Sequence, residues 1–268
     1  MSAGLTHDRM LDALEAQVGL VRFALDRAEL ETAVDSCPGW SVRDLVLHLG
    51  AVNWWGGENV RAGDPGQRAR GMGAIRDSAP PADDGAAALE RWYAGLADEM
   101  LRTFGAADPA APVWTFAGPG RADYWLRRPL HETAIHRWDL EHALGGEDAT
   151  TPLPEDVAVD TVDEFCTEMY PRMSAGLPPL PVGIRLRAEL HAPERLSDGA
   201  APVGSRAPGP DLGWTLPGPD GAGSVAVTGP PETLALLLWG RVGADEPGLE
   251  ISGDRAALDA ALEAGLSV

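Results

Sequence analysis

The stretch "SVRDLVLHLGAVNWWGGENV", residues 41–60, has the pattern of one helix together with its first turn. Ser41 and Asp44 form an S-x-x-D capping pair, which satisfies backbone N–H groups that otherwise have no partner at the start of a helix. His48 falls in the middle of this helix. Its apolar neighbours are Leu45, Leu47, Leu49 and Val52. Because an unpartnered imidazole is unfavourable to bury, His48 needs either a hydrogen-bond partner or a role as a ligand.

Three more helices are predicted around this one. Over residues 10–28 apolar side chains recur at three- and four-residue steps, which makes one stripe of an amphipathic helix. The stripe consists of Leu11, Leu14, Val18, Val21 and Leu25. Residues 86–104 have a helical period too, and a fourth helix is expected from about residue 126 to the Gly145–Gly146 stop. Gly- and Pro-rich loops separate the helices, so residues 1–150 are predicted to form an antiparallel four-helix bundle.

The second part of the chain has a different pattern. A fifth helix is predicted over about residues 154–173, as a bridge from the bundle. Beyond it, residues 184–191 alternate apolar and polar side chains with the two-residue period of a half-buried strand. Further strands and helices are expected, in chain order, at 213–219, 223–229, 230–243, 248–254 and 255–266. We therefore expect an α+β protein whose second, smaller domain covers residues 151–268.

Charge and cysteine content narrow the functional classes. The chain has 41 acidic and 21 basic residues, every basic residue is Arg, and the net charge is -20. Such a field disfavours nucleic acid and anionic membranes as partners, and an acidic substrate would need a local arginine cluster. The only two cysteines, Cys37 and Cys166, match no metal or redox spacing and are interpreted as unpaired thiols. Because neither an export signal nor a membrane-spanning run is found, a cytoplasmic location is expected.

The stretch "LHETAIHRWDLEHA", residues 130–143, concentrates coordinating side chains on one predicted helix. Glu132 and His136 are four residues apart, so they project from one face and can hold one object. With His48 as a third ligand they would form a site with one open position, as catalytic zinc sites have. Two plainer interpretations stay open, namely an exposed i,i+4 pair of Glu132 with His136 and a hydrogen-bonded, buried His48.

Other residues near these ligands allow several roles. Asp139 could orient a ligand ring through a hydrogen bond, form a surface salt bridge with Arg137, or cap the helix. Glu141 and His142 are expected to face water. Structural or surface roles are expected for His7, His131 and His191. Trp40 is predicted to pack as a helix staple. A position in the core or in a pocket wall is expected for Trp54, Trp55 and Trp138.

Taken together, three motifs resemble one family. "CPGWSVRDLVLHLG" (37–50) resembles the W-[ST]-V-x-D-L-x-x-H-L segment of the mycothiol-dependent maleylpyruvate isomerase family, a branch of the DinB-like metalloenzyme superfamily. "HETAIHRWDLEHA" (131–143) resembles its E-x-x-x-H-R-x-D helix, and "ETLALLLWGRVGADEPGLEISGD" (232–254) is similar to its sterol-carrier-protein-like C-terminal module. The resemblance implies a DinB-like bundle that holds a divalent metal, usually zinc, through His48, Glu132 and His136.

The resemblance also implies mycothiol as a thiol cosubstrate. An open zinc position would bind the thiol as a thiolate. In the isomerases the thiolate adds to a conjugated cis double bond, rotation follows, and elimination gives the trans isomer. In related S-transferases the conjugate is released instead. Family members use an arginine from the C-terminal domain, for which Arg241 is the best match and Arg127 and Arg128 are alternatives. Arg241 could equally only close its own helix by contacting the last carbonyls.

Three functions are compatible with these patterns. The leading hypothesis is a zinc-dependent enzyme that activates mycothiol, most simply as a maleylpyruvate-type cis–trans isomerase. The alternative is a mycothiol S-transferase that acts on an electrophile or a biosynthetic intermediate. A non-catalytic small-molecule-binding protein, with an apolar ligand in the C-terminal module, is the third. No motif in residues 62–84 or 105–125 identifies the second substrate.

Overall fold

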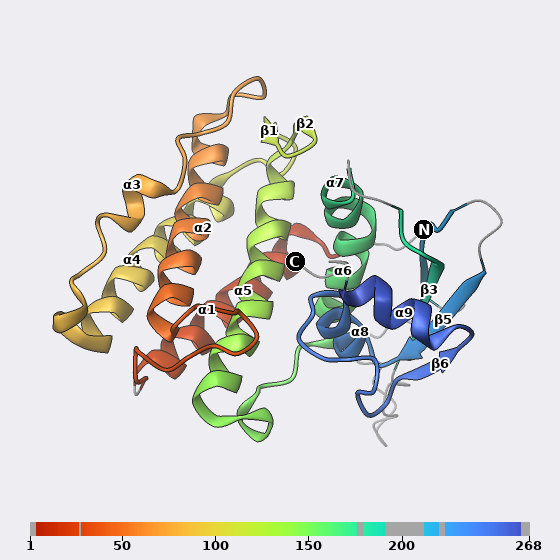
Figure 1. The fold of residues 1–268 in the computed structure, drawn as a ribbon. Coiled ribbons are helices and arrows are strands. Elements are labelled where there is room, and N and C mark those ends of the chain that lie inside the picture. Colours follow the sequence, from red (N-terminus) through yellow and green to blue (C-terminus); the bar gives the residue numbers. More distant parts are fainter. Residues whose placement is uncertain (1–3, 27, 176–178, 191–211, 220–222, 264–268) are drawn as a thin grey trace, which may run out of the picture. The chain divides into compact units, whose positions relative to one another are not determined.

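The computed structural model describes residues 4–26, 28–175, 179–190, 212–219 and 223–263. The chain divides into two compact units (Figure 1). One unit spans Leu5–Pro152, and the other consists of Leu153–Val268 together with Met1–Gly4. His191 and the end of the predicted closing helix, 264–266, lie outside the described residues.

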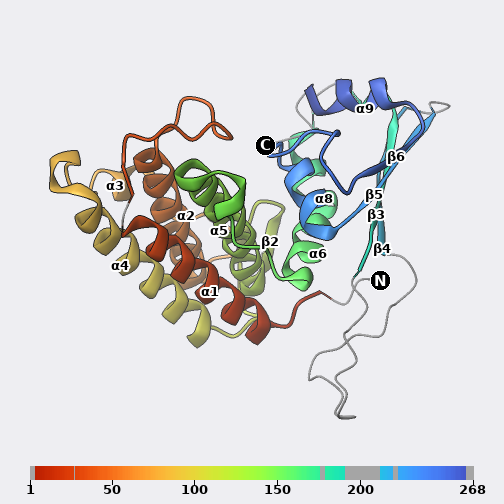
Figure 2. The ribbon, with the colours of Figure 1, turned by 90° about the horizontal axis from the view of Figure 1, so that it is seen from below.

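The first unit is built from four long helices, as predicted. They are α1 (His7–Leu25), α2 (Val42–Ala62), α4 (Gly85–Ala106) and α5 (Ala122–Gly145). Helices α1 and α2 each pack against both α4 and α5, which closes the bundle (Figures 1 and 2). The predicted stripe on α1 is buried from Leu14 to Leu25, and Leu45, Val46 and Leu49 of α2 face the same core.

The helix starts follow from local hydrogen bonds. The predicted capping box at the start of α2 is confirmed, since Ser41 Oγ accepts from the Asp44 N–H and the Asp44 carboxylate accepts from the Ser41 N–H at 2.9 Å. Helix α1 begins at His7 instead of residue 10, because the Thr6 hydroxyl accepts from the Arg9 N–H. Helix α5 begins four residues before the expected position and continues through Pro129.

Glycines bring α2 close to its neighbours. A Cβ atom at Gly50 would lie 2.3 Å from the Trp92 ring of α4, and one at Gly56 would lie 3.0 Å from Pro129 of α5. Larger residues at these positions would push the helices apart. The short distance between α2 and α5 is what allows a side chain in the middle of α2 to reach one on α5.

Two segments that were predicted as loops contain short elements. Strands β1 (Pro112–Thr115) and β2 (Gly118–Arg121) pair as a hairpin, and α3 (Gly73–Arg76) lies between α2 and α4. The hairpin is held by an aromatic cluster of Trp55, Trp114, Phe116, Tyr124 and Trp125. Tertiary packing of these rings, which a local sequence pattern does not show, fixes this hairpin. Short 3₁₀ turns occupy Ala82–Asp84 and Glu147–Ala149.

The second unit is the predicted α+β arrangement. Helix α6 (Glu155–Glu164) continues through a π-helical turn (Phe165–Met169) into α7 (Tyr170–Met173). The strands are β3 (Gly183–Ala188), β4 (Leu212–Leu216), β5 (Ser224–Gly229) and β6 (Glu250–Ser252). They form one mixed sheet in the order β4-β3-β5-β6, in which β3 and β5 are parallel and the other pairs are antiparallel. Helices α8 (Pro231–Leu238) and α9 (Arg255–Ala261) pack on this sheet (Figure 1).

Apolar side chains fill the core of the second unit. Alternate residues of β3 and β5 point inward, so that Ile184, Leu186, Val225 and Val227 are buried against α8. Helix α8 is rich in leucine because it packs on both the sheet and α6. No helix among the described residues is long and apolar enough to cross a membrane.

Candidate metal centre

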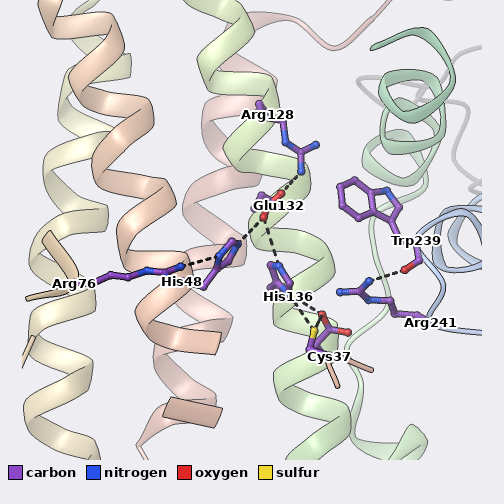
Figure 3. A network of polar contacts seen from close by, with 9 residues as sticks. Cys37, His48, Arg76, Arg128, Glu132, His136, Trp239 and Arg241 are labelled. Atoms are coloured by element: carbon purple, nitrogen blue, oxygen red, sulfur yellow. Dashed lines mark hydrogen bonds and ion pairs between the residues drawn. The ribbon is translucent and has the colours of Figure 1, made fainter. Parts of the chain in front are cut away.

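Three side chains from α2 and α5 converge at one point (Figure 3). His48 Nε2 lies 2.8 Å from Glu132 Oε1, and His136 Nε2 lies 3.5 Å from the same oxygen. The potential ligand atoms of the three residues all lie within 4.8 Å of one another. The structure therefore brings together the three residues that the sequence singled out as metal ligands.

The local structure explains this convergence. Glu132 and His136 are one turn apart on α5, so their side chains project from the same face. His48 is presented by the middle of α2, which Gly56 allows to approach α5 closely. The side chains of His48 and Glu132 are 18% and 14% exposed, so the cluster is shielded from bulk water without being sealed.

Arg128 holds the second oxygen of Glu132. It is buried and forms an i,i+4 ion pair with Glu132 Oε2, so that Oε1 alone faces the two imidazoles. Burial raises the pKa of Glu132, but the charge of Arg128 and hydrogen bonds with His136 and His48 outweigh it and hold the pKa well below its usual value. The carboxylate is therefore anionic at neutral pH.

His136 is held on its other nitrogen by Asp139. Asp139 Oδ2 lies 2.8 Å from His136 Nδ1, and Asp139 Oδ1 accepts a hydrogen bond from the Ser36 hydroxyl at 2.6 Å. Burial lowers the pKa of His136, but hydrogen bonds with Asp139, Cys37 and Glu132 outweigh it and hold the pKa well above its usual value. Of the roles considered for Asp139, the structure shows the contact with the His136 ring.

One alternative considered for this helix and one prediction about it are wrong. Arg137 is fully buried, and its Nη1 donates to Glu141 Oε2 at 2.6 Å, so it does not form a surface salt bridge with Asp139. Glu141 is only 9% exposed and also accepts from the Thr151 N–H at 2.7 Å, although it was expected to face water. The reason is that α5 is buried on every side over this turn, a property that a pattern of apolar residues does not reveal.

Three residues near the centre were not predicted. The Trp40 ring lies 5.0 Å from the His48 ring and 5.8 Å from the His136 ring between centroids, so it does more than staple a helix. The Cys37 thiol donates to Asp139 Oδ2 at 3.5 Å. Trp40 and Cys37 lie in the "CPGW" run just before the helix cap, so the motif itself was an available signal. Arg76 Nη2 donates to His48 Nδ1 at 3.4 Å from α3, and nothing in the sequence indicated this contact.

The donor set of His48, Glu132 and His136 fits a divalent metal ion. Two imidazoles and one carboxylate are ligands that zinc and similar ions accept. Tetrahedral bonds of the usual zinc length place neighbouring ligand atoms about 3.3 Å apart. The observed separation of 3.5 Å matches this value, and the separation of 2.8 Å needs only a small shift. Within the described parts of the chain a second ligand group, Cys37 with His136 and Asp139, shares His136 with the first.

Arg241 lies in the second unit, just after α8. Its Nη1 donates to the carbonyl oxygen of Trp239 at 2.5 Å (Figure 3). This is the helix-closing type of contact that the sequence allowed for it. Its role toward a substrate stays a prediction. Of the two alternative arginines, Arg128 is committed to the Glu132 ion pair, and Arg127 is part-buried.

Comparison with known families places both units. The Mycothiol maleylpyruvate isomerase N-terminal domain matches residues 11–141, and the MDMPI C-terminal domain matches residues 156–260. The chain belongs to the mycothiol maleylpyruvate isomerase family. The resemblance that the sequence motifs indicated is thus confirmed. A search of curated proteins gives no match.

Two solved structures have the same fold as this chain. One is described as the crystal structure of the mycothiol-dependent maleylpyruvate isomerase, with a TM-score of 0.64 and 17% sequence identity. The other is a histidine-to-alanine mutant of that enzyme, with a TM-score of 0.62 and 17% identity. Each alignment covers 92% of this chain and 93% of the other. At this identity the likeness establishes the fold.

Proposed function

We propose that this protein is a metal-dependent enzyme that uses mycothiol to isomerise a small maleyl-type acid from cis to trans. The observation that carries the proposal is the convergence of His48 Nε2, His136 Nε2 and Glu132 Oε1 at one point between α2 and α5. Membership of the family supports it, as does the description of both solved structures as mycothiol-dependent maleylpyruvate isomerase. A donor set of this kind has no evident purpose in a bundle that serves only as a scaffold for a C-terminal module with an apolar ligand.

The metal would be held by His48, Glu132 and His136. A divalent cation in that position supplies positive charge that lowers the pKa of a bound thiol, so that the thiol reacts as a thiolate. The chain itself supplies the geometry and the charge balance. Arg128 keeps Glu132 anionic and turns one of its oxygens toward the imidazoles. Three protein ligands leave a coordination position for the cosubstrate.

The reaction needs no net proton transfer. The sulfur of mycothiol forms a C–S bond to one carbon of the conjugated cis double bond, and the electron pair moves toward the neighbouring carbonyl. The remaining C–C bond is single and rotates. The C–S bond then breaks, which returns the double bond as trans and the thiol unchanged. The Trp40 ring lies beside both imidazoles and gives this place an aromatic wall.

An acidic substrate must be received by local positive charge, because the chain carries a net charge of -20. We assign this role to Arg241, whose guanidinium matches a carboxylate in shape. An Arg241→Met variant should raise the KM for a maleyl-type acid more than it lowers kcat. Arg241→Lys should recover part of the loss. An unchanged KM in both variants would remove Arg241 from the proposal.

Metal content tests the centre without any substrate. His48→Ala and Glu132→Ala should each lower the zinc content of the purified protein while far-ultraviolet circular dichroism stays helical, because open catalytic sites contribute little to folding. The matched control is His142→Ala, on the same helix as His136 but stacked on Trp138 away from the cluster. Full metal content in both ligand variants would refute the assignment.

Incubation with mycothiol and a panel of maleyl-type acids tests the reaction. Mass spectrometry and chromatography should show the trans acid with free mycothiol returned after each turnover. A thioether that accumulates would identify the S-transferase chemistry of the family instead. If neither product forms with zinc-loaded protein, the enzymatic proposal fails.

A further inference from the structure

Asp139 is the centre of a buried polar cluster that lies on the Nδ1 side of His136. Asp139 is fully buried, and its two oxygens have different partners. Oδ1 accepts from the Ser36 hydroxyl at 2.6 Å, and Oδ2 contacts His136 Nδ1 at 2.8 Å. The Cys37 thiol donates to Oδ2 as well, at 3.5 Å. A carboxylate on α5 is thus held by the connector between α1 and α2.

This arrangement fixes which nitrogen of His136 carries a proton. An ionised carboxylate has only acceptor positions, so the ring nitrogen that contacts it must donate. When the ring is neutral, as a metal ligand must be, the proton stays on Nδ1 and the lone pair is on Nε2, the atom that lies 3.5 Å from Glu132 Oε1. The other tautomer would place two acceptors 2.8 Å apart in a buried site, which is strongly unfavourable.

The connector has a hydrogen-bonded structure of its own. The Cys37 N–H donates to the Val34 carbonyl at 2.8 Å, and the Trp40 N–H donates to the Cys37 carbonyl at 3.0 Å. The Val34 N–H donates to the Trp40 carbonyl at 2.9 Å, and the Val34 side chain is buried. The hydrogen bonds of this turn therefore fix the position of Ser36 independently of its contact with Asp139. The same turn carries Trp40, whose ring stacks on His136.

We propose that the turn Ser36–Trp40 is the positioning element of His136. Ser36 and Cys37 hold Asp139, and Asp139 holds the imidazole so that Nε2 points to the place shared with Glu132 and His48. Ser36, Cys37 and Asp139 are positioning residues that act through His136. The inference rests on the proposed function only for the presence of a metal ion at that place.

Zinc affinity, measured by competition with a chromogenic chelator without thiol or substrate, tests the chain of contacts. Asp139→Ala should weaken zinc binding about 10- to 100-fold, as the loss of a ligand's hydrogen-bond partner does. Asp139→Asn keeps an oxygen that can accept from Nδ1, so it should recover part of the affinity. Ser36→Ala removes one hydrogen bond to Asp139, so its zinc affinity should fall roughly three- to tenfold. Cys37→Ser keeps a donor and should bind zinc like the wild type.

Glu141→Ala is the matched control. It also removes a buried carboxylate from α5, but its partners are Arg137 and Thr151 and not His136. Its zinc affinity should stay close to that of the wild type even where its stability falls. Equal losses in Glu141→Ala and Asp139→Ala would show a general effect of destabilised α5 and would overturn the inference.

Nuclear magnetic resonance of protein labelled with ¹⁵N in histidine gives a second readout that does not depend on zinc. The wild type should show a slowly exchanging proton on His136 Nδ1, which Asp139→Ala should lose and Glu141→Ala should keep. A wild type that takes up no zinc would refute the metal centre, while this comparison would still decide the role of Asp139. An unchanged Nδ1 signal in Asp139→Ala would overturn the inference. A zinc affinity of Ser36→Ala equal to that of the wild type would overturn it as well.

Discussion

The Trp40 indole stacks on the His136 imidazole, with 5.8 Å between ring centroids and an interplanar angle of 27°. The same indole lies 5.0 Å from the His48 ring. One aromatic side chain therefore contacts both imidazoles of the candidate metal centre. Its emission should respond to whatever changes the charge or the bonding of these rings.

Trp40 should report metal binding by its fluorescence. Cobalt(II) titrated into metal-stripped wild type should quench the emission, and Trp40→Phe should abolish most of that change. Trp138→Phe is the control, because Trp138 stacks on His142 and not on a ligand. If Trp40→Phe leaves the quenching intact while Trp138→Phe removes it, the ion binds elsewhere.

The sequence predicted the three residues of the candidate metal centre but not their surroundings, for a physical reason. His48, Glu132 and His136 lie on long periodic helices, so their residue types and spacing were enough to place them on facing sides of a bundle. Ser36, Cys37 and Trp40 lie in a turn whose shape depends on hydrogen bonds such as that between Val34 and Trp40. No periodicity shows such a turn, and contacts made about 100 residues apart in the chain are not visible in it.

The buried Arg137–Glu141 pair should be essential for stability and dispensable for metal binding. Arg137→Met leaves Glu141 as a buried charge with one partner fewer, so it should lower the free energy of unfolding by about 3–5 kcal/mol. Urea unfolding measures this loss. Arg22→Met, which breaks an exposed pair with Glu90, should cost no more than about 1 kcal/mol. If the two variants lost similar free energies of unfolding, the burial of Arg137 would add nothing to stability.

The fold was easier to predict from the sequence than the polar core of the bundle. Four periodic helices and the capping box of Ser41 were evident from local patterns. The hairpin at Pro112–Arg121 was not, because its Gly- and Pro-rich sequence is typical of loops and only packing of Trp114 and Phe116 on Trp55 orders it. Burial of Arg137 and Glu141 likewise depends on contacts with α1 and with Thr151.

The stability of metal-stripped protein should depend on pH through Glu132 and His136. The pKa of Glu132 is lowered by folding, so its contribution is present above its ordinary pKa of 4.5 and is lost as the pH falls. The pKa of His136 is raised by folding, so its contribution is complete below 6.5 and is lost as the pH rises through the folded value. The stability difference between wild type and Glu132→Gln should therefore be largest between these two values. Urea unfolding at a series of pH values measures this difference in stability. A difference that stays constant from acid to alkaline pH would contradict the opposite pKa shifts of Glu132 and His136.

Cys166, which is part-buried, should react slowly with thiol reagents in the native protein. Burial, aided by the negative charge of Asp163, raises the pKa of its thiol from 9.0 to about 12. Three pKa units mean about a thousandfold less thiolate, the form that reacts with disulfide reagents. In a Cys37→Ser background, where Cys166 is the single remaining thiol, labelling with an aromatic disulfide should be at least that much slower in buffer than in urea. Equal rates in buffer and in urea would mean that the π-helical turn at Phe165–Met169 does not bury this thiol in solution.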